Sequence, residues 1–201
     1  MRLVVGLSGA SGIVYGIRLL QVLRERNVQT ELIATPTAKR MVELETNYDF
    51  EEIASLATRV HSIDDLESAI SSGGYPVDGM VVVPCSMKTL AGIACGYASN
   101  LLLRAADVTL KERRPLVLVP RETPLNAIHL KNMLQLARMG TTILPAMPAF
   151  YNKPSTVSEL VDFVVGKALD VMRIEHSLYR KWGIKDKCAG DSSSAQSARE
   201  N

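Results

Sequence analysis

The sequence is poor in aromatic residues and in cysteine. Phe, Trp and Tyr make up 5% of the 201 residues, whereas 47% of all residues are hydrophobic, so we expect a mostly aliphatic core. The three cysteines, Cys85, Cys95 and Cys188, are odd in number and lack CxxC spacing. This pattern argues against a disulfide framework and a cysteine-ligated metal site, and it suits a reducing cytosol. A chain of this length can bury the core of one domain without either.

An excess of one charge and a long apolar run are also missing. Lys and Arg number 23 against 21 for Asp and Glu, so the chain lacks the basic face that a nucleic-acid binder needs. No apolar run reaches the length of about 18 residues expected for a membrane helix, and the N-terminus has no signal-peptide pattern. We therefore expect a cytoplasmic protein that binds neither nucleic acid nor a membrane.

Short aliphatic runs alternate with amphipathic stretches along the chain. The runs predict strands buried on both faces, at residues 3–7, 29–34, 79–83, 116–119 and 141–144. The stretches predict helices at residues 13–26, 38–45, 50–56, 64–71, 90–97, 101–113, 125–138 and 157–174. This alternation predicts a single α/β domain with a doubly wound parallel sheet over residues 1–184. The Ser-rich residues 185–201 are predicted to be disordered.

The loop after the first predicted strand consists of small residues. Small residues let the backbone approach a ligand closely, and the amides at the start of the next helix favour an anion. The loop does not match the G-x-G-x-x-G dinucleotide fingerprint, because Ser8 stands where a first loop glycine would be, ahead of Gly9 and Gly12. A phosphate or cofactor loop and a tight turn without a ligand both remain open.

Other predicted strands end in polar residues as well. Of the two threonines after the second strand, Thr37 is predicted to cap a helix and Thr35 to contact a ligand. Hydroxyls and a lysine in residues 86–89 follow the third strand, and Arg121 and Glu122 follow the fourth. Because ligands bind beyond the carboxyl ends of parallel strands, we predict a site there for an anionic, partly flat ligand.

Some polar or reactive residues have ordinary structural explanations. Cys85 is predicted to be a small buried residue, because no histidine lies near it in the sequence to activate a thiolate. Arg104, Asp107 and Lys111 recur at three- and four-residue spacing, which predicts a salt-bridged helix face. His61 lies among polar residues and is predicted to be on the surface.

A set of motifs in a fixed order resembles one family, the UbiX-like flavin prenyltransferases, long described as aromatic acid decarboxylase subunits. The resemblance extends over nearly the whole chain, about residues 3–182. The motifs that carry it are Gly6-Leu7-Ser8-Gly9-Ala10-Ser11-Gly12, Pro84-Cys85-Ser86-Met87-Lys88-Thr89-Leu90, Arg104-Ala105-Ala106-Asp107-Val108, Lys111-Glu112-Arg113-Arg114-Pro115, Pro120-Arg121-Glu122-Thr123-Pro124 and Pro148-Ala149-Phe150-Tyr151.

The resemblance implies a flavodoxin-like, Rossmann-like fold and a metal-independent transferase. The implied reaction joins the dimethylallyl group of dimethylallyl phosphate to N5 and C6 of reduced FMN. Its product, prenylated FMN, is the cofactor of a partner UbiD-like decarboxylase. The family is generally a homododecamer with its sites at subunit contacts.

The resemblance also implies roles for individual residues. Those expected to contact the flavin are Gly9, Ala10, Ser11, Thr35, Ser86, Met87, Lys88, Thr89 and Arg121. Those expected to bind the prenyl phosphate or line the prenyl pocket are Tyr151, Lys167, Lys111, Arg104 and Trp182. Glu122 and Ser11 match the pair that handles protons. Thr35-Pro36 replaces the common Ser-Lys, which keeps the hydroxyl but removes a possible cationic contact.

Two other functions remain open at this point. An FMN-dependent cysteine decarboxylase resembles this fold, but such enzymes rely on an early histidine and an Asn-containing loop. The histidines here, His61, His129 and His176, are not beside the predicted strand tips. A non-catalytic FMN-binding carrier subunit of a decarboxylase would not need the second phosphate site that Tyr151 and Lys167 predict.

Overall fold

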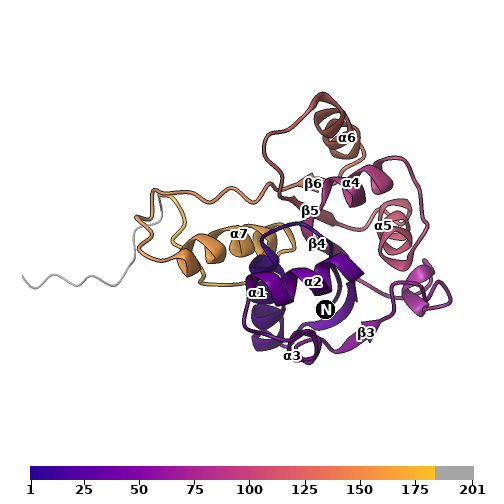
Figure 1. Ribbon diagram of the computed structural model, residues 1–201, viewed down its shortest axis with the longest axis horizontal. Helices are drawn as coiled ribbons and strands as arrows, with labels where there is room; N and C mark the ends of the chain where they lie inside the picture. Colours follow the sequence, from indigo (N-terminus) through magenta and orange to yellow (C-terminus); the bar gives the residue numbers. More distant parts are fainter. Residues whose placement is uncertain (184–201) are drawn as a thin grey trace, which may run out of the picture.

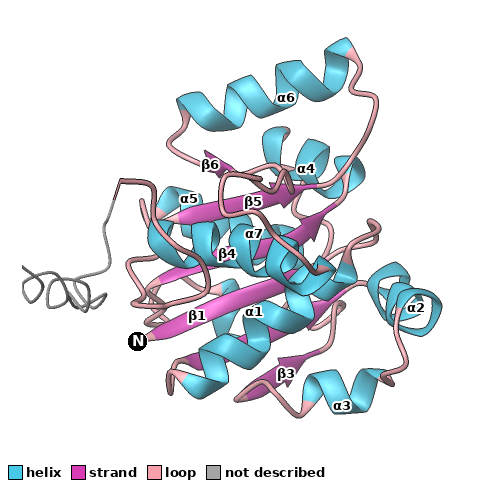
Figure 2. Cartoon of the chain, turned by 90° about the vertical axis from the view of Figure 1, so that its left-hand side faces the viewer, coloured by secondary structure: helices cyan, strands magenta, loops and turns pink. Residues whose placement is uncertain are grey.

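The computed structural model describes residues 1–183, in which a six-stranded parallel sheet lies between two layers of helices (Figures 1 and 2). The strands are β1 (Arg2–Leu7), β2 (Gln29–Ala34), β3 (Arg59–His61), β4 (Gly79–Cys85), β5 (Leu116–Pro120) and β6 (Thr142–Ile143). The helices are α1 (Ile13–Glu25), α2 (Pro36–Glu45), α3 (Phe50–Ala54), the 3₁₀ helix η1 (Ala69–Ser71), α4 (Met87–Ala94), α5 (Leu101–Lys111), α6 (Ala127–Arg138) and α7 (Val157–Val171). The tail predicted to be disordered lies outside the described residues. Within residues 1–183, no helix is long and apolar enough to cross a membrane.

Both faces of the sheet are buried, as the aliphatic runs predict. In β1, Leu3 and Val5 pack in the core shared with α1 and α7, whereas Val4 packs in the core on the opposite face, with α4 and α5. Figure 2 shows α1 and α7 in front of the strands and α5 behind them. Because successive side chains of a strand point to opposite faces, a strand between two helix layers is mostly apolar along its length. The doubly wound α/β fold is confirmed.

The strand order β3-β2-β1-β4-β5-β6 determines where a ligand can enter. The chain builds the sheet outward from β1 to β3, then crosses to β4 and builds outward in the other direction. β1 and β4 are therefore neighbours, with Leu3 opposite Gly79 and Gly6 opposite Val82. The helices that follow β1 and β4 pack on opposite faces of the sheet, and in such sheets ligands bind beyond the carboxyl ends of the strands at this reversal.

The region between β2 and β4 differs from the sequence prediction. The predicted helix at residues 64–71 is reduced to η1, and residues 59–61 form the edge strand β3. The prediction of a surface His61 is wrong. Its side chain is 7% exposed, and Nε2 lies 2.7 Å from Glu31 Oε2 while Nδ1 lies 2.8 Å from Ser68 Oγ. A strand of three residues is too short to show a period, so only its pairing with β2 reveals it.

Two helices begin earlier than predicted. α2 begins at Pro36, because Thr35 rather than Thr37 is its cap: Thr35 Oγ1 accepts the Ala38 N–H at 3.1 Å. Proline is favourable at the first helical position, where no backbone N–H is required. α4 begins directly after Ser86, whose Oγ accepts the Thr89 N–H at 3.3 Å. Both caps lie at strand tips, so the helix amides face the carboxyl edge of the sheet.

Candidate functional site

The β1–α1 loop is tied closely to the loop after β4. Ser8 is fully buried; its hydroxyl donates to Pro84 O at 3.0 Å and accepts the Ser86 N–H at 2.8 Å. At Gly9, a Cβ atom would lie 2.4 Å from Thr37 Cβ, so a larger residue would separate the loop from α2. The glycine is therefore required by the close approach of the loop to α2, independent of any ligand.

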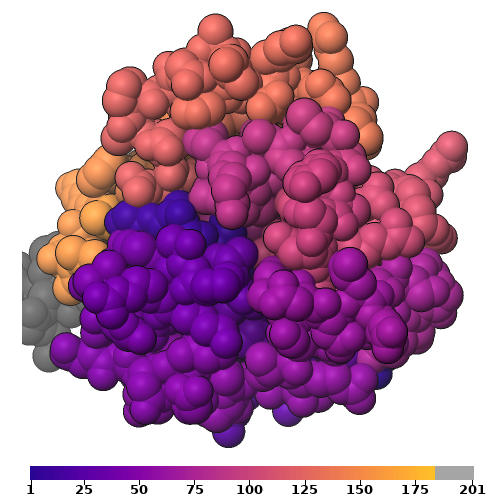
Figure 3. All heavy atoms as spheres, turned by 45° about the vertical axis from the view of Figure 1, so that its right-hand side comes forward, coloured from indigo at the N-terminus to yellow at the C-terminus, as the bar shows by residue number. Residues whose placement is uncertain are grey.

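A cavity of about 140 Å³ lies beside these loops. Thr35, Lys88 and Thr89 line it, and all three are among the predicted flavin contacts. Figure 3 shows the indigo start of the chain in the hollow between the purple segment that includes α2 and the magenta segment that includes α4. Two hydroxyls and an ammonium group in one cavity form a donor set that fits a phosphate.

Arg121 joins the β5–α6 loop to the same edge. Its Nε donates to Ser11 O at 3.1 Å, which links the third loop to the first. Glu122 is exposed, and within residues 1–183 its carboxylate makes no hydrogen bond or ion pair, so it is available to a ligand. We call the predicted flavin contacts in these loops the sheet-edge site; they are Gly9, Ala10, Ser11, Thr35, Ser86, Met87, Lys88, Thr89 and Arg121.

Glu45 is a site residue that the sequence analysis missed. Its Oε2 accepts the N–H of Gly12 at 2.8 Å and of Ile13 at 3.0 Å, so a carboxylate from the end of α2 occupies the start of α1. The positive end of a helix dipole stabilises such a charge. Glu45 follows Gly12 by 33 residues and belongs to no motif, so no local signal points to this contact. It brings a carboxylate to Gly12, the residue after Ser11.

Cys85 ends β4 but is not placed as a nucleophile. It is fully buried, and this burial strongly raises the pKa of its thiol. A reactive cysteine needs an accessible thiolate, so the prediction of a structural Cys85 is confirmed. Among residues 1–183, no group of three His, Cys, Asp or Glu side chains is arranged to hold a metal ion.

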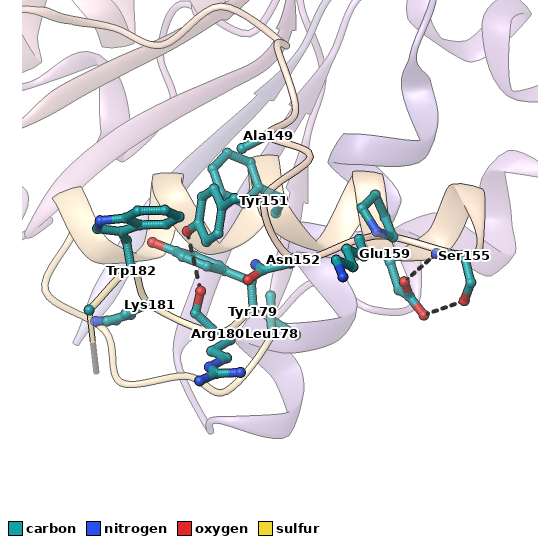
Figure 4. Close-up of a pocket in the computed structure, with 14 residues that line it drawn as sticks. Ala149, Tyr151, Asn152, Ser155, Glu159, Leu178, Tyr179, Arg180, Lys181 and Trp182 are labelled. Atoms are coloured by element: carbon teal, nitrogen blue, oxygen red, sulfur yellow. Dashed lines mark hydrogen bonds between the residues drawn. The ribbon is translucent and has the colours of Figure 1, made fainter. Parts of the chain in front are cut away.

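Two of the five residues expected to bind the prenyl phosphate or line the prenyl pocket lie around a second, larger cavity of about 890 Å³ (Figure 4). Tyr151 and Trp182 line it; their ring centroids are 5.1 Å apart and their planes are nearly perpendicular. The Tyr151 hydroxyl donates to Arg180 O at 3.2 Å. None of the residues that line this cavity belongs to the sheet-edge site. We call the rings gathered here the aromatic cluster; they are Tyr151, Phe163, Tyr179 and Trp182.

The remaining predicted residues lie elsewhere in the chain. On α7, Lys167 Nζ is 3.8 Å from Asp170 Oδ2. On α5, Arg104 Nε donates to Ser71 O at 3.1 Å and Nη1 to Asp107 at 2.7 Å, so this part of the salt-bridged face is confirmed.

Lys111 departs from that pattern, because it pairs with its neighbour Glu112. It ends α5, shortly before β5 begins, and so lies toward the amino edge of the sheet. Arg121 follows β5 at the carboxyl edge. The predicted site residues therefore form separate groups within one chain.

The fold and the sheet-edge loops define an α/β protein whose cleft at the strand reversal suits a phosphate-bearing, partly flat ligand. A family model described as Flavoprotein matches residues 1–169. The flavin prenyltransferase UbiX of Methanocaldococcus jannaschii is 48% identical over 183 residues, which cover 91% of this chain and 99% of that protein.

Two crystal structures are similar over most of the chain. The dodecameric FMN-dependent UbiX-like decarboxylase of Escherichia coli O157:H7 has a TM-score of 0.89 and 54% identity, with 90% of this chain and 99% of that chain covered. AnUbiX (PadA1), in complex with FMN and dimethylallyl pyrophosphate, has a TM-score of 0.90 and 45% identity, with 92% and 98% covered. The chain belongs to the flavoprotein family and, within it, to the UbiX-like flavin prenyltransferases.

Proposed function

We propose that this protein transfers the dimethylallyl group of dimethylallyl phosphate to N5 and C6 of reduced FMN and so forms prenylated FMN. The observation that carries the proposal is the sheet-edge site, where Arg121 reaches Ser11 across the strand reversal at 3.1 Å. The similarity of the chain to AnUbiX, whose structure contains FMN and dimethylallyl pyrophosphate, supports the choice of substrates. We also propose that a UbiD-like decarboxylase receives the product.

The sheet-edge site would hold the flavin. Lys88 and the hydroxyls of Thr35 and Thr89 suit its phosphate, because charge-assisted hydrogen bonds to an anion are short and strong. Small residues in the β1–α1 loop let its backbone approach the flavin closely. When bound, the reduced flavin supplies the nucleophilic atoms of the reaction.

The second substrate needs a different environment. Tyr151, Lys167, Lys111 and Arg104 would neutralise the departing phosphate by hydrogen bonds and charge, without a metal ion. The allyl group that remains must be shielded from water, and Trp182 offers a π face for a developing positive charge. A non-catalytic carrier would not require these proposed substrate-binding residues.

We infer that the complete site forms where copies of the chain meet. In one chain Tyr151 and Trp182 line a cavity apart from the sheet-edge site, and Lys111 lies toward the opposite edge of the sheet from Arg121. Residues with one common substrate must converge, so another copy has to supply some of them. The dodecamer formed by the relative of 54% identity supports an oligomer of this kind.

Closing the second ring requires a base that removes a proton from the flavin. Glu122 and Ser11 are the pair that we propose for proton handling. Glu45 is a competing carboxylate, because it is bound to the amide of Gly12, the residue after Ser11. A general base must lie within hydrogen-bond reach of its proton, directly or through one water.

The decisive experiment is the mass of the flavin released after anaerobic incubation of the protein with reduced FMN and dimethylallyl phosphate. We expect a gain of one five-carbon prenyl unit. Recovery of unmodified FMN, with dimethylallyl phosphate shown to bind, would instead favour the carrier or the cysteine decarboxylase. Addition of the released flavin to an apo UbiD-like decarboxylase tests the proposed recipient by recovery of its activity.

A further inference from the structure

Beyond α7, the chain returns along the helix, and its side chains converge on Asp170. Lys181 Nζ lies 2.8 Å from Asp170 Oδ1, His176 Nε2 lies 3.2 Å from the same oxygen, and the Tyr179 hydroxyl donates to Oδ2. Lys167 Nζ is 3.8 Å away, the longest of these contacts. One carboxylate on α7 thus receives three side chains from residues 176–181.

The surface of α7 next to Asp170 is shaped for the same segment. A Cβ atom at Gly166 would lie 2.6 Å from the ring of Tyr179 and 2.8 Å from that of His176. Gly166 and Asp170 are four residues apart, so they lie on one face of the helix, one turn from each other. The small residue admits the two rings and the carboxylate binds their polar atoms.

The segment attached to Asp170 also contacts Tyr151. The Tyr151 hydroxyl donates to Arg180 O, and Trp182 packs edge-on against the Tyr151 ring (Figure 4). Tyr179 lies 4.8 Å from Phe163, whose ring lies 6.1 Å from Tyr151. The position of Tyr151 therefore depends on a segment that Asp170 attaches to α7.

We propose that Asp170 is a positioning residue, which anchors residues 176–182 on α7 and so places Tyr151 and Trp182 for the prenyl phosphate. The identity of that substrate rests on the proposed function. Asp170 also contacts Lys167, whose Nζ lies 3.8 Å from Oδ2. Because Lys167 is half exposed and makes the longest contact, it can turn to a phosphate while Lys181 and Tyr179 still satisfy the carboxylate.

The anchor is charged throughout the range in which the enzyme would be assayed. Partial burial acts to raise the pKa of Asp170, but the hydrogen bonds from Lys181, Tyr179 and His176 outweigh it and hold the pKa at about 2. Burial, together with the hydrogen bond to Asp170, raises the pKa of the Tyr179 hydroxyl, which keeps it a donor. Asp170 is thus a permanent attachment point rather than a pH switch.

The chain offers a specific reporter and a matched control. Trp182 is its single tryptophan, so tryptophan fluorescence reports on this segment alone. Asp162 lies on the same helix, with its side chain 19% exposed against 23% for Asp170, and pairs with Arg18 at 2.6 Å. Asp162→Asn therefore removes a comparable charge outside the anchor. Gly166→Ala disturbs the anchor and leaves every charge in place.

The test compares these three variants with the unaltered, FMN-loaded full chain. For Asp170→Asn and Gly166→Ala, we expect the anisotropy of Trp182 to gain a fast decay component. The KM for dimethylallyl phosphate should rise about tenfold, as for one lost charge-assisted hydrogen bond, while kcat changes by less than about threefold. FMN affinity should be unchanged in all variants, and Asp162→Asn should match the unaltered chain.

Two results would overturn the proposal. One is a Trp182 anisotropy or a KM in Asp170→Asn that matches Asp162→Asn. The other is an equal loss of FMN affinity and of dimethylallyl phosphate binding, which would indicate a general structural defect. If the unaltered chain transfers no prenyl group, the proposed function fails, and the anisotropy alone decides whether Asp170 anchors the segment.

Discussion

The sheet-edge site and the aromatic cluster are held in place by different means. In the sheet-edge site, a fully buried Ser8 connects two loops through backbone groups, and Arg121 connects a third loop through Ser11 O. In the aromatic cluster, side-chain contacts to Asp170 and ring contacts predominate. Trp182 there is 79% exposed, whereas Thr89 of the sheet-edge site is 4% exposed.

This difference is consistent with separate binding of the two proposed substrates, the flavin and the prenyl phosphate. A site built from strand tips and buried hydrogen bonds is formed in one chain and suits a rigid flavin. A cluster of exposed rings has apolar surface still to bury, which suits a site completed by another copy. Changes in one region should therefore leave the other largely unaffected, and the following predictions test that independence.

The largest effect is expected for the proton-handling carboxylates. Glu122→Gln should retain FMN and attach the prenyl group, but should slow closure of the second ring by about 100- to 10,000-fold, the usual contribution of a general base. Mass and absorption spectra of the released flavin would distinguish the two stages. Glu45→Gln is the matched comparison. Normal ring closure by Glu122→Gln, with a stall in Glu45→Gln, would transfer the role to Glu45.

A smaller effect is expected when the sheet edge alone is disturbed. Ser8→Ala leaves the Ser86 N–H without its buried acceptor, whereas Pro84 O keeps the backbone N–H of residue 8 at 3.2 Å. We expect the free energy of unfolding to fall by about 1–3 kcal/mol and FMN binding to weaken. Urea denaturation and FMN titration measure the two quantities. The exposed Ser158 on α7 provides the control, and equal losses in Ser158→Ala would contradict the explanation.

The aromatic cluster can be weakened without removal of a ring. Tyr151→Phe keeps the edge-on contact with Trp182 but loses the hydrogen bond to Arg180 O and a donor for the phosphate. The KM for dimethylallyl phosphate should rise about fivefold, which corresponds to one modest hydrogen bond. Steady-state kinetics and FMN titration provide the measurement. A parallel loss of FMN affinity would show that the two regions are not independent.

The smallest effect is on stability at low pH. Because the pKa of Asp170 is lower in the folded chain than its usual 3.8, its contribution is complete above about pH 4 and is lost as the pH falls toward about 2. With solvent screening of this partly exposed group, we expect about 1 kcal/mol. Urea unfolding of the unaltered chain and Asp170→Asn should differ most at pH 6, by about half as much near pH 3, and converge only below about pH 2. A constant difference would disagree with this linkage.

Local patterns in the sequence were enough to predict the strands and the loops that follow them. The aliphatic runs that became β1, β4 and β5 had to be buried on both faces, so their alternation with helices predicted the doubly wound sheet. The polar residues at the strand tips then predicted the sheet-edge site. Cys85 could be assigned to the core because no activating histidine was near it.

Other features depended on contacts between distant parts of the chain. Glu45 reaches Gly12 across 33 residues, and β3 exists because β2 provides its hydrogen-bond partners. The separation of Tyr151 from the sheet-edge site depends on how residues 176–182 fold back onto Asp170. A sequence pattern records which face of an element is apolar, but such polar contacts depend on where two elements meet in space. By itself the sequence determined the sheet, because apolar runs record which faces must be buried, and the tertiary structure determined how the predicted site residues are grouped.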